Sequence, residues 1–231
     1  MARGLSVTIS VIIPTLDEAA GIQSAIEAVA ALRPHEILVA DGGSRDGTPA
    51  LAAARPCRVV ASPRGRAVQM NAGAASATGD VLLFLHADTR LPPTAFDEVD
   101  RALADLDTVA GRFDVRLDRT GAVYRLIETL MNARSRASRI ATGDQAIFVR
   151  RRVFEDLGGY APIPLMEDVE FSRRLKRRGR VACLRTRVVT SARRWEQAGP
   201  WRTILRMWWL RALYAAGVSP HRLARAYAPI R

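Results

Sequence analysis

Short apolar runs and amphipathic stretches alternate along the first 110 residues of the chain. The apolar runs are dense in Val, Ile, Leu and Phe, which is typical of strands buried on both faces of a sheet. Strands that alternate with helices at this spacing predict an α/β fold with a doubly wound, mostly parallel sheet and flanking helices. The predicted strands are residues 7–14, 36–40, 58–61 and 81–85, and the predicted helices are 17–32, a short alanine-rich helix after Asp46-Gly47-Thr48-Pro49, and 65–77.

The second half of the chain alternates less regularly. Residues 109–117 alternate as a strand does, with Phe113, Val115 and Leu117 on one face and charged side chains on the other. We therefore predict one domain over residues 1–195, divided into halves at 1–106 and 107–195, and a helical tail at 196–231. After residue 117 we expect a basic helix at 121–139, a strand at 143–149, a helix at 166–178 and a tail helix at 200–214.

Length and composition are those of a globular protein that can bury a large core. The chain has 231 residues, of which 48% are hydrophobic. Cys57 and Cys183 stand in apolar contexts without the spacing of zinc ligands, so we expect buried thiols of a reduced compartment. The N-terminal apolar stretch is too short for a secretion signal. We therefore expect a cytoplasmic protein.

Positive charge is concentrated in the C-terminal half. The net charge is +12, and nearly all of it comes from arginine, because Lys176 is the only lysine. Residues 1–131 carry 13 basic and 16 acidic side chains, whereas residues 132–231 carry 22 basic and 7 acidic ones. The basic half is expected to meet phosphates, acidic lipid or an anionic substrate, unless it is only a solvated surface.

Polar side chains follow three of the predicted strands. In parallel α/β sheets ligands bind beyond the carboxyl ends of the strands, so these segments should converge on one crevice. In the segment Asp41-Gly42-Gly43-Ser44, two glycines allow close approach of the backbone to a ligand, and Asp41 suits a hydrogen bond to a base or sugar. An ordinary Asp/Gly turn would give the same pattern. The segments are Thr15-Leu16-Asp17-Glu18, Asp41-Gly42-Gly43-Ser44 and His86-Ala87-Asp88.

His86 and Asp88 are two positions apart, so an extended backbone points both side chains to the same face. Carboxylate oxygens suit Mg²⁺ or Mn²⁺, and imidazole tolerates Mn²⁺ better. A divalent ion there would clamp a diphosphate and neutralise the charge that grows on a leaving group. A histidine that is merely hydrogen-bonded at a strand end is the alternative.

An acidic pair opens the predicted helix at 166–178. Adjacent helical residues lie about 100° apart, so one of Glu167 and Asp168 can face a cleft as a general base. Stabilisation of the helix dipole alone would select the same pair. Arginines near the expected crevice offer guanidinium forks that suit phosphates, although most arginines in this chain should be solvated. These arginines are Arg64, Arg66, Arg193 and Arg194.

Taken together and in this order, the segments resemble the family 2 glycosyltransferases of the GT-A fold. Residues 41–48 resemble the family's Asp-Asp-Gly-Ser-x-Asp-Gly-Thr, and residues 85–88, after Thr78-Gly79-Asp80, occupy the place of its metal-binding Asp-x-Asp. The resemblance covers residues 7–195. Its other parts are residues 12–18 as the opening strand and loop, 66–73 as the helix after the third strand, 143–145 as the acceptor-side strand, and 167–168 as the Glu-Asp motif.

The resemblance implies transfer of a sugar, with inversion, from a nucleotide-sugar donor to an acceptor hydroxyl. A UDP-sugar is the preferred donor, and the acceptor is unknown. Asp168 would be the catalytic base, and Asp88 with His86 would bind Mn²⁺ or Mg²⁺ as cofactor. The donor would lie against Pro14, Thr15, Glu18, Asp41, Arg66, Asn71 and Ala87, and the acceptor side would include Gly143, Asp144, Gln145, Glu167, Arg194 and Trp195.

Three positions depart from the family's pattern. Gly42 replaces its second aspartate, His86 replaces the first aspartate of Asp-x-Asp, and Ser191 replaces the glutamine of the Gln-x-x-Arg-Trp motif of processive members. The last departure predicts a single transfer rather than polymerisation. The His-Ala-Asp-Thr variant and the tryptophan-rich tail are also similar to the bacterial branch associated with radical-SAM and selenodomain proteins.

The tail at residues 200–216 is shorter than the roughly 20 apolar residues of a membrane span. Its tryptophans among arginines suit an interfacial helix on acidic lipid, at the inner face of the membrane. A helix packed on the domain, or on the partner of a homodimer, is the alternative.

Two rival classes of protein share some of these features. A GT-A-like nucleotidyltransferase would carry a glycine-rich basic stretch after the first strand, which residues 15–21 lack. A basic protein that binds nucleic acid or membrane without catalysis would use the C-terminal half. The aromatic content is only 6% and no recognition motif is present, so no nucleic-acid partner is expected.

Overall fold

The computed structural model describes residues 7–227, and these form an α/β fold around one sheet. The strands are β1 (Ile9–Thr15), β2 (Glu36–Asp41), β3 (Arg58–Ala61), β4 (Val81–Phe84), β5 (Thr89–Arg90), β6 (Thr108–Leu117), β7 (Phe148–Arg150) and β8 (Arg180–Thr190). The helices are α1 (Ile22–Ala30), α2 (Thr48–Ala53), α3 (Arg66–Ser76), α4 (Ala95–Leu103), α5 (Ala122–Ser138), the 3₁₀ turn η1 (Gly143–Gln145), α6 (Arg151–Asp156), α7 (Glu167–Arg178), α8 (Arg193–Ala198), α9 (Pro200–Ala215) and α10 (Pro220–Ala226).

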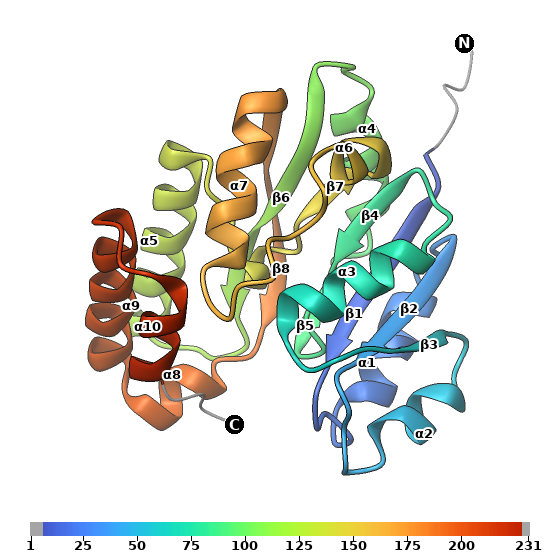
Figure 1. The fold of residues 1–231 in the computed structure, drawn as a ribbon, viewed down its shortest axis with the longest axis horizontal. Coiled ribbons are helices and arrows are strands. Elements are labelled where there is room, and N and C mark those ends of the chain that lie inside the picture. Colours follow the sequence, from blue (N-terminus) through green and yellow to red (C-terminus); the bar gives the residue numbers. More distant parts are fainter. Residues whose placement is uncertain (1–6, 228–231) are drawn as a thin grey trace.

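The eight strands of the described residues lie in the order β3-β2-β1-β4-β7-β6-β8-β5, with helices on both faces (Figure 1). β1 pairs in parallel with β2 and β4, and β2 pairs in parallel with β3. The doubly wound parallel arrangement predicted for the first half is therefore confirmed. The second half adds antiparallel pairs, because β7 runs against both β4 and β6.

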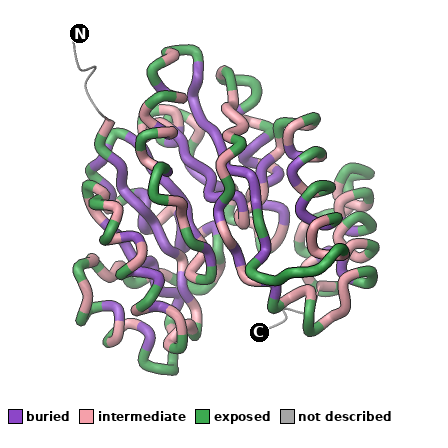
Figure 2. Tube along the Cα trace, turned by 180° about the vertical axis from the view of Figure 1, so that it is seen from behind, coloured by how far each residue is buried: buried purple, intermediate pink, exposed green. Residues whose placement is uncertain are grey.

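Two apolar clusters, one on each face of the sheet, form most of the core. Val11 and Ile13 belong to the cluster beneath α1 and α4, whereas Ile12 and Leu38 belong to the cluster beneath α3 and α7. Figure 2 accordingly shows the central strands β1, β2, β4 and β6 as almost continuously buried. Burial on both faces explains why these strands appear in the sequence as unbroken apolar runs.

Several predicted element boundaries are wrong. The first helix begins at Ile22 rather than at residue 17, because Asp17 has a left-handed backbone (φ 55°) and its N–H donates to the Ser44 side chain. The strand predicted at 143–149 is the turn η1 followed by β7, since Ala146 is also left-handed (φ 46°). Neither cysteine is fully buried, contrary to expectation.

β8, α4 and α6 were not predicted. β8 was missed because Arg180, Arg185 and Arg187 interrupt its apolar pattern. Its pairing with β6 also contains two register shifts, so that side chains do not alternate regularly along the strand.

Two of the three charged side chains on one face of β6 are buried, and only Arg116 is exposed. Arg112 is 1% exposed, and Asp114 is 5% exposed. The Asp114 carboxylate accepts hydrogen bonds from Arg112 and, at 2.5 Å, from Nη2 of Arg136 on α5. One carboxylate thus serves two guanidinium groups inside the second half of the molecule.

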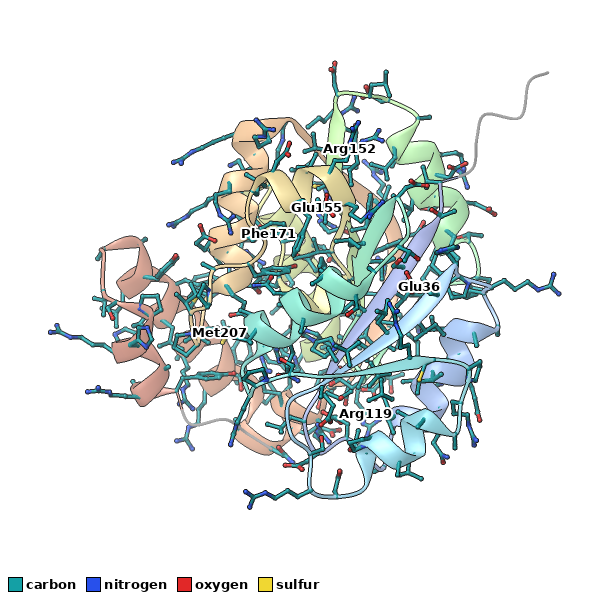
Figure 3. The ribbon with its side chains drawn as sticks, turned by 45° about the vertical axis from the view of Figure 1, so that its right-hand side comes forward. Glu36, Arg119, Arg152, Glu155, Phe171 and Met207 are labelled. Atoms are coloured by element: carbon teal, nitrogen blue, oxygen red, sulfur yellow. The ribbon has the colours of Figure 1, made fainter. Side chains whose placement is uncertain are left out.

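The tail packs on the domain with one face and leaves the other exposed. Leu210 of α9 is fully buried and forms a small cluster with Met166, Val169 and Leu223. Met207 lies where the tail meets the rest of the molecule (Figure 3). On the outer face, Trp201, Leu205, Trp208 and Trp209 are between 55% and 68% exposed. Of the helices in residues 7–227, none has the length and hydropathy to cross a bilayer.

Candidate functional site

The loops that follow β1 and β2 interlock through hydrogen bonds. The N–H of Glu18 donates to Thr48 Oγ1 (2.9 Å), and the N–H of Ala19 donates to Asp46 Oδ2 (2.8 Å). In return, Asp17 Oδ1 accepts the N–H of Arg45 (2.9 Å). The two loops thus form one rigid wall at the carboxyl ends of the central strands.

Asp41 lies at the base of this wall and shapes its turn. Its Oδ2 accepts the N–H groups of Gly43 (2.9 Å) and Ser44 (3.0 Å), and its Oδ1 accepts the hydroxyl of Thr15 (3.4 Å). Gly43 has φ +85°, which favours glycine there. Asp41 and Thr15 are both buried, so any contact with a nucleotide is made from a fixed position.

Gln69, which the sequence analysis did not single out, explains why Gly42 is a glycine. Its amide Nε2 donates to the carbonyl of Thr15 (2.6 Å) and to that of Ala40 (3.1 Å), at the ends of β1 and β2. A Cβ at position 42 would lie 2.9 Å from Gln69 Cδ. The departure from the family's second aspartate therefore makes room for a buried amide. A polar residue on the inner side of α3 was the only signal in the sequence.

Asn71 has a structural partner on the opposite loop. Its Nδ2 donates to the carbonyl of Tyr160 (2.8 Å), and its Oδ1 accepts the Tyr160 N–H (2.9 Å). Tyr160 in turn packs on Phe171 of α7, with ring centroids 4.4 Å apart (Figure 3). Asn71 thus ties α3 to the segment that leads into α7, and its predicted donor contact stays a prediction.

His86 is paired with Asp144 rather than with Asp88. Its Nδ1 lies 3.2 Å from Asp144 Oδ1. Its Nε2 is buried, has no hydrogen-bond partner among the described residues, and faces Gly143, where a Cβ would lie only 2.4 Å away. The imidazole therefore connects the end of β4 to η1 on the acceptor side.

Asp88 offers a single exposed carboxylate at the tip of the sheet. Within residues 7–227 there is no group of three or more His, Cys, Asp or Glu side chains arranged to hold a metal ion. Mg²⁺ and Mn²⁺ can nonetheless bind through one or two carboxylates when substrate phosphates and water complete the coordination. Asp88 fits an ion that arrives with a diphosphate, and it does not fit a permanently held metal.

Glu18 and Asp88 share this crevice although they lie 70 positions apart. Burial raises the pKa of Glu18, the charge of Arg193 opposes that rise, and the negative charge of Asp88 adds to it. The donor-side residues Pro14 and Ala87 lie in or directly after β1 and β4, and Arg66 is the first residue of α3. The residues that follow β1 and β4 therefore lie close to Arg193 of α8.

Asp144 is held in its ionised form. Burial would raise its pKa, but the hydrogen bond and the charge of His86 outweigh this effect. The positive charges of Arg194 and Arg66 lower the pKa of Asp144 further. In the same way, Asp144 and Asp88 help to raise the pKa of Arg194 against the effect of its burial. Negative and positive groups thus alternate across the cleft.

Asp168 stands at the N-terminus of α7 with its carboxylate fixed by two backbone donors. Its Oδ2 accepts the N–H of Gly143 (3.0 Å), and its Oδ1 accepts the N–H of Val169 (2.7 Å). The neighbouring Glu167 is 6% exposed. Burial and the charge of Asp168 raise the pKa of Glu167, although Arg66 opposes them. Of the acidic pair, Glu167 is buried, whereas Asp168 is half-buried and held by two backbone donors.

Of the predicted acceptor-side residues, Asp144, Arg194 and Trp195 line one cleft, whereas Gly143, Gln145 and Glu167 are not part of its lining. Gln145 is fully buried and serves structure, since its side chain accepts the N–H of Thr142 (3.1 Å) in a capping box. A second hollow adjoins the cleft, because Arg194 and Gln197 line both. The cleft is lined by Asp88, Leu117, Met131, Asp144, Thr190, Ser191, Arg193, Arg194, Trp195 and Gln197.

A crevice at the carboxyl ends of a parallel sheet, with one free carboxylate at a strand tip and a second on a facing helix, defines a GT-A-type transferase. The comparison with protein families agrees, because the model of "Glycosyl transferase family 2" matches residues 10–158. The chain belongs to this family, so the predicted resemblance and fold are confirmed. No curated protein matches the sequence.

Solved structures of glycosyltransferases share the fold. A mannosyltransferase from Pyrobaculum calidifontis, in complex with GDP-Man and Mn²⁺, is 21% identical, with a TM-score of 0.67 over 97% of this chain and 66% of that one. Glucosyl-3-phosphoglycerate synthase from Mycobacterium tuberculosis, with Mn²⁺, UDP-Glc and phosphoglyceric acid, is 23% identical, with a TM-score of 0.59 over 78% of this chain and 70% of that one. Mannosyl-3-phosphoglycerate synthase from Rubrobacter xylanophilus is 20% identical, with a TM-score of 0.59 over 85% and 76%.

Proposed function

We propose that this family 2 glycosyltransferase moves one sugar from a nucleotide-sugar donor to an acceptor hydroxyl, with inversion at the sugar carbon. The observation that carries this proposal is the position of Asp168. Its carboxylate is held by Gly143 and Val169 beside the cleft that Asp88 and Asp144 line. In one displacement, the acceptor oxygen attacks the sugar, Asp168 takes the hydroxyl proton, and the nucleoside diphosphate leaves.

The cofactor is a divalent metal ion, Mn²⁺ or Mg²⁺, and Asp88 is the residue that would hold it. When bound, the ion neutralises charge on the departing diphosphate. The geometry favours Asp88 over His86 as ligand, since Nδ1 of His86 faces Asp144 and Nε2 is enclosed by Gly143. We therefore expect metal and nucleotide to bind together, with weak binding of the metal alone.

For the donor we propose a UDP-sugar, with a GDP-sugar as the alternative, since similar folds hold UDP-Glc or GDP-Man. Single transfer rests on Ser191, which replaces the glutamine of processive members. Assignment to the bacterial radical-SAM and selenodomain-associated branch rests on His86-Ala87-Asp88-Thr89 and on the tryptophans of the tail.

We further propose that the exposed face of α9 rests on an anionic membrane, on its cytoplasmic side. Trp201, Leu205, Trp208 and Trp209 form an apolar strip, and Arg202 beside it is also exposed. Tryptophan next to arginine suits the interface of acidic lipid. Flotation with phosphatidylglycerol vesicles should carry the wild type but not Trp208→Ala/Trp209→Ala. A dimer in solution that this double variant dissociates would assign the strip to self-association instead.

Calorimetric titration tests the donor site. UDP, GDP and CMP are titrated into wild type and Asp88→Asn, each with and without Mn²⁺. One nucleotide should bind tightly only with the ion, and the variant should lose most of the gain due to the ion. An Asp97→Asn variant, on the exposed side of α4, is the matched control. If none of the nucleotides binds wild type under either condition, the proposed function is wrong.

A further inference from the structure

Two arginines from different helices, Arg134 of α5 and Arg211 of α9, lie near enough to Asp168 for their charges to interact with it. Leu210 of α9 packs against Met166 and Val169, the neighbours of Asp168, and so brings the next residue, Arg211, to the start of α7. The end of α5 is also fixed to α7, because the N–H of Ala141 donates to the Ser172 side chain (3.1 Å) and Lys176 Nζ donates to the carbonyl of Ser138 (2.6 Å). Figure 1 shows α5, α7 and the tail helices at the same end of the molecule.

The guanidinium groups of Arg134 and Arg211 are half-buried, and no residue that the structure describes pairs with either. None of the ion pairs or side-chain hydrogen bonds among residues 7–227 includes either group. Burial and the like charge of Arg211 lower the pKa of Arg134 to about 10, and Asp168 offsets this only in part. Burial also lowers the pKa of Arg211. Half-buried charges of one sign without partners are costly unless a ligand of the opposite sign binds.

The layer beneath adds more positive charge. Arg112 is buried and shares the single carboxylate of Asp114 with Arg136. Nε and Nη2 of Arg112 have no hydrogen-bond partner in the part of the chain that the structure describes. In this layer the one carboxylate of Asp114 therefore pairs with two guanidinium groups.

We propose that the acceptor carries a phosphate or carboxylate group, which Arg134 and Arg211 bind while the acceptor hydroxyl faces Asp168. This inference rests on the proposed function and names the class of its acceptor. A planar guanidinium fork binds either anion in bidentate fashion. The anion neutralises the charges of Arg134 and Arg211. It also orients the acceptor hydroxyl toward Asp168, which accepts its proton.

The donor diphosphate does not account for these two arginines. Glu18 and Asp88, which line the donor crevice, interact electrostatically with Arg193 and Arg194. The charge of Asp168 acts on both Arg134 and Arg211, and neither Glu18 nor Asp88 is among the charges that shift the pKa of these two arginines. Arg194 feels Asp88 and Asp168 alike, so it lies between the donor side and the two arginines.

Binding of inorganic phosphate to enzyme saturated with UDP and Mg²⁺ tests the inference, because the nucleotide then fills the donor site. We expect Arg134→Gln and Arg211→Gln each to weaken phosphate binding about tenfold, the loss expected for one charge-assisted hydrogen bond. Arg134→Lys keeps the charge but loses the bidentate fork, so its phosphate affinity should fall between those of the wild type and Arg134→Gln, a graded loss that a merely structural role would not predict. Arg222→Gln, on the exposed side of α10, removes a charge from the same tail and should change binding less than twofold.

A parallel titration with vesicles of phosphatidic acid, against phosphatidylcholine, distinguishes the two sources of such an anion. If the vesicles bind through both arginines and free phosphate does not, the anion is a lipid headgroup, and the inference stands. If neither probe depends on Arg134 or Arg211, the inference is wrong. Titration of UDP into the same preparations separates this result from failure of the proposed function, because nucleotide binding does not involve these arginines.

Discussion

The two halves of the cleft are built in opposite ways. On the donor side, the loops after β1 and β2 satisfy their own hydrogen-bonding groups, because the carboxylates of Asp17, Asp41 and Asp46 all accept backbone N–H groups from these loops. On the acceptor side, Arg134 and Arg211 stand half-buried without partners among residues 7–227. The donor wall thus needs no ligand to satisfy its polar groups, whereas the two arginines opposite are the groups that we propose to bind an anionic acceptor.

The largest effect is expected at the point where the two halves meet. Asp168→Asn keeps the size of the side chain and the contact with Gly143, but the amide cannot accept the acceptor's proton. The transfer rate should fall about 10²- to 10⁴-fold, while nucleotide affinity stays unchanged. Single-turnover assays beside UDP titration measure both quantities. An active variant would mean that another group is the base.

A smaller effect is expected from breaking the donor wall itself. Gly42→Asp restores the family's aspartate but displaces the Gln69 amide from the carbonyls of Thr15 and Ala40. The free energy of unfolding should drop by about 1–3 kcal/mol, the cost of buried polar groups left unpaired. Gln69→Ala should cost a similar amount. Because both changes break the same bonds, their effects in the double variant should be clearly less than additive in urea denaturation.

The link between the halves can be tested at Asn71. Asn71→Ala removes both hydrogen bonds to the backbone of Tyr160 and should lower stability by about 1–2 kcal/mol. If Asn71 only ties the loop, UDP affinity should change little once the protein is folded. A large loss of UDP affinity at unchanged stability would show a direct contact with the donor.

The smallest effect concerns the response of stability to acid. The pKa of Asp144 is lowered in the folded protein, so its ionised form stabilises the fold above the unfolded value of about 3.9. That contribution is lost as the pH falls below this value. Asp144→Asn should therefore flatten the dependence of thermal stability on pH between about 5 and 3. The Asp97→Asn control should follow the wild-type curve.

The sequence predicted the donor half far better than the acceptor half. Buried parallel strands appear as continuous apolar runs, so β1 to β4 and the loops after them could be placed in order. β8 could not, because its arginines and its register shifts hide the alternation of a strand. Nor did the sequence indicate that Arg134 and Arg211 meet Asp168, since residues on three helices come together only through tertiary packing.

The individual side chains of the site also differ in how far their roles could be predicted from the sequence. His86 was singled out as a metal ligand beside Asp88, which stays a prediction, and its partner Asp144 could not be predicted because it lies 58 positions away. Gln69 had no motif at all. Its importance follows from the space left by Gly42, which the sequence presents only as a mismatch with the family.

The Gly42–Gln69 contact also constrains how this sequence can change over time. A larger residue at position 42 is tolerated only after position 69 becomes smaller, and the smaller residue at 69 leaves two carbonyls exposed until position 42 fills the space. Neither single step is neutral. The two positions should therefore be replaced together, so that aligned relatives carry either the Gly/Gln pair or an Asp with a short partner, and rarely a mixture.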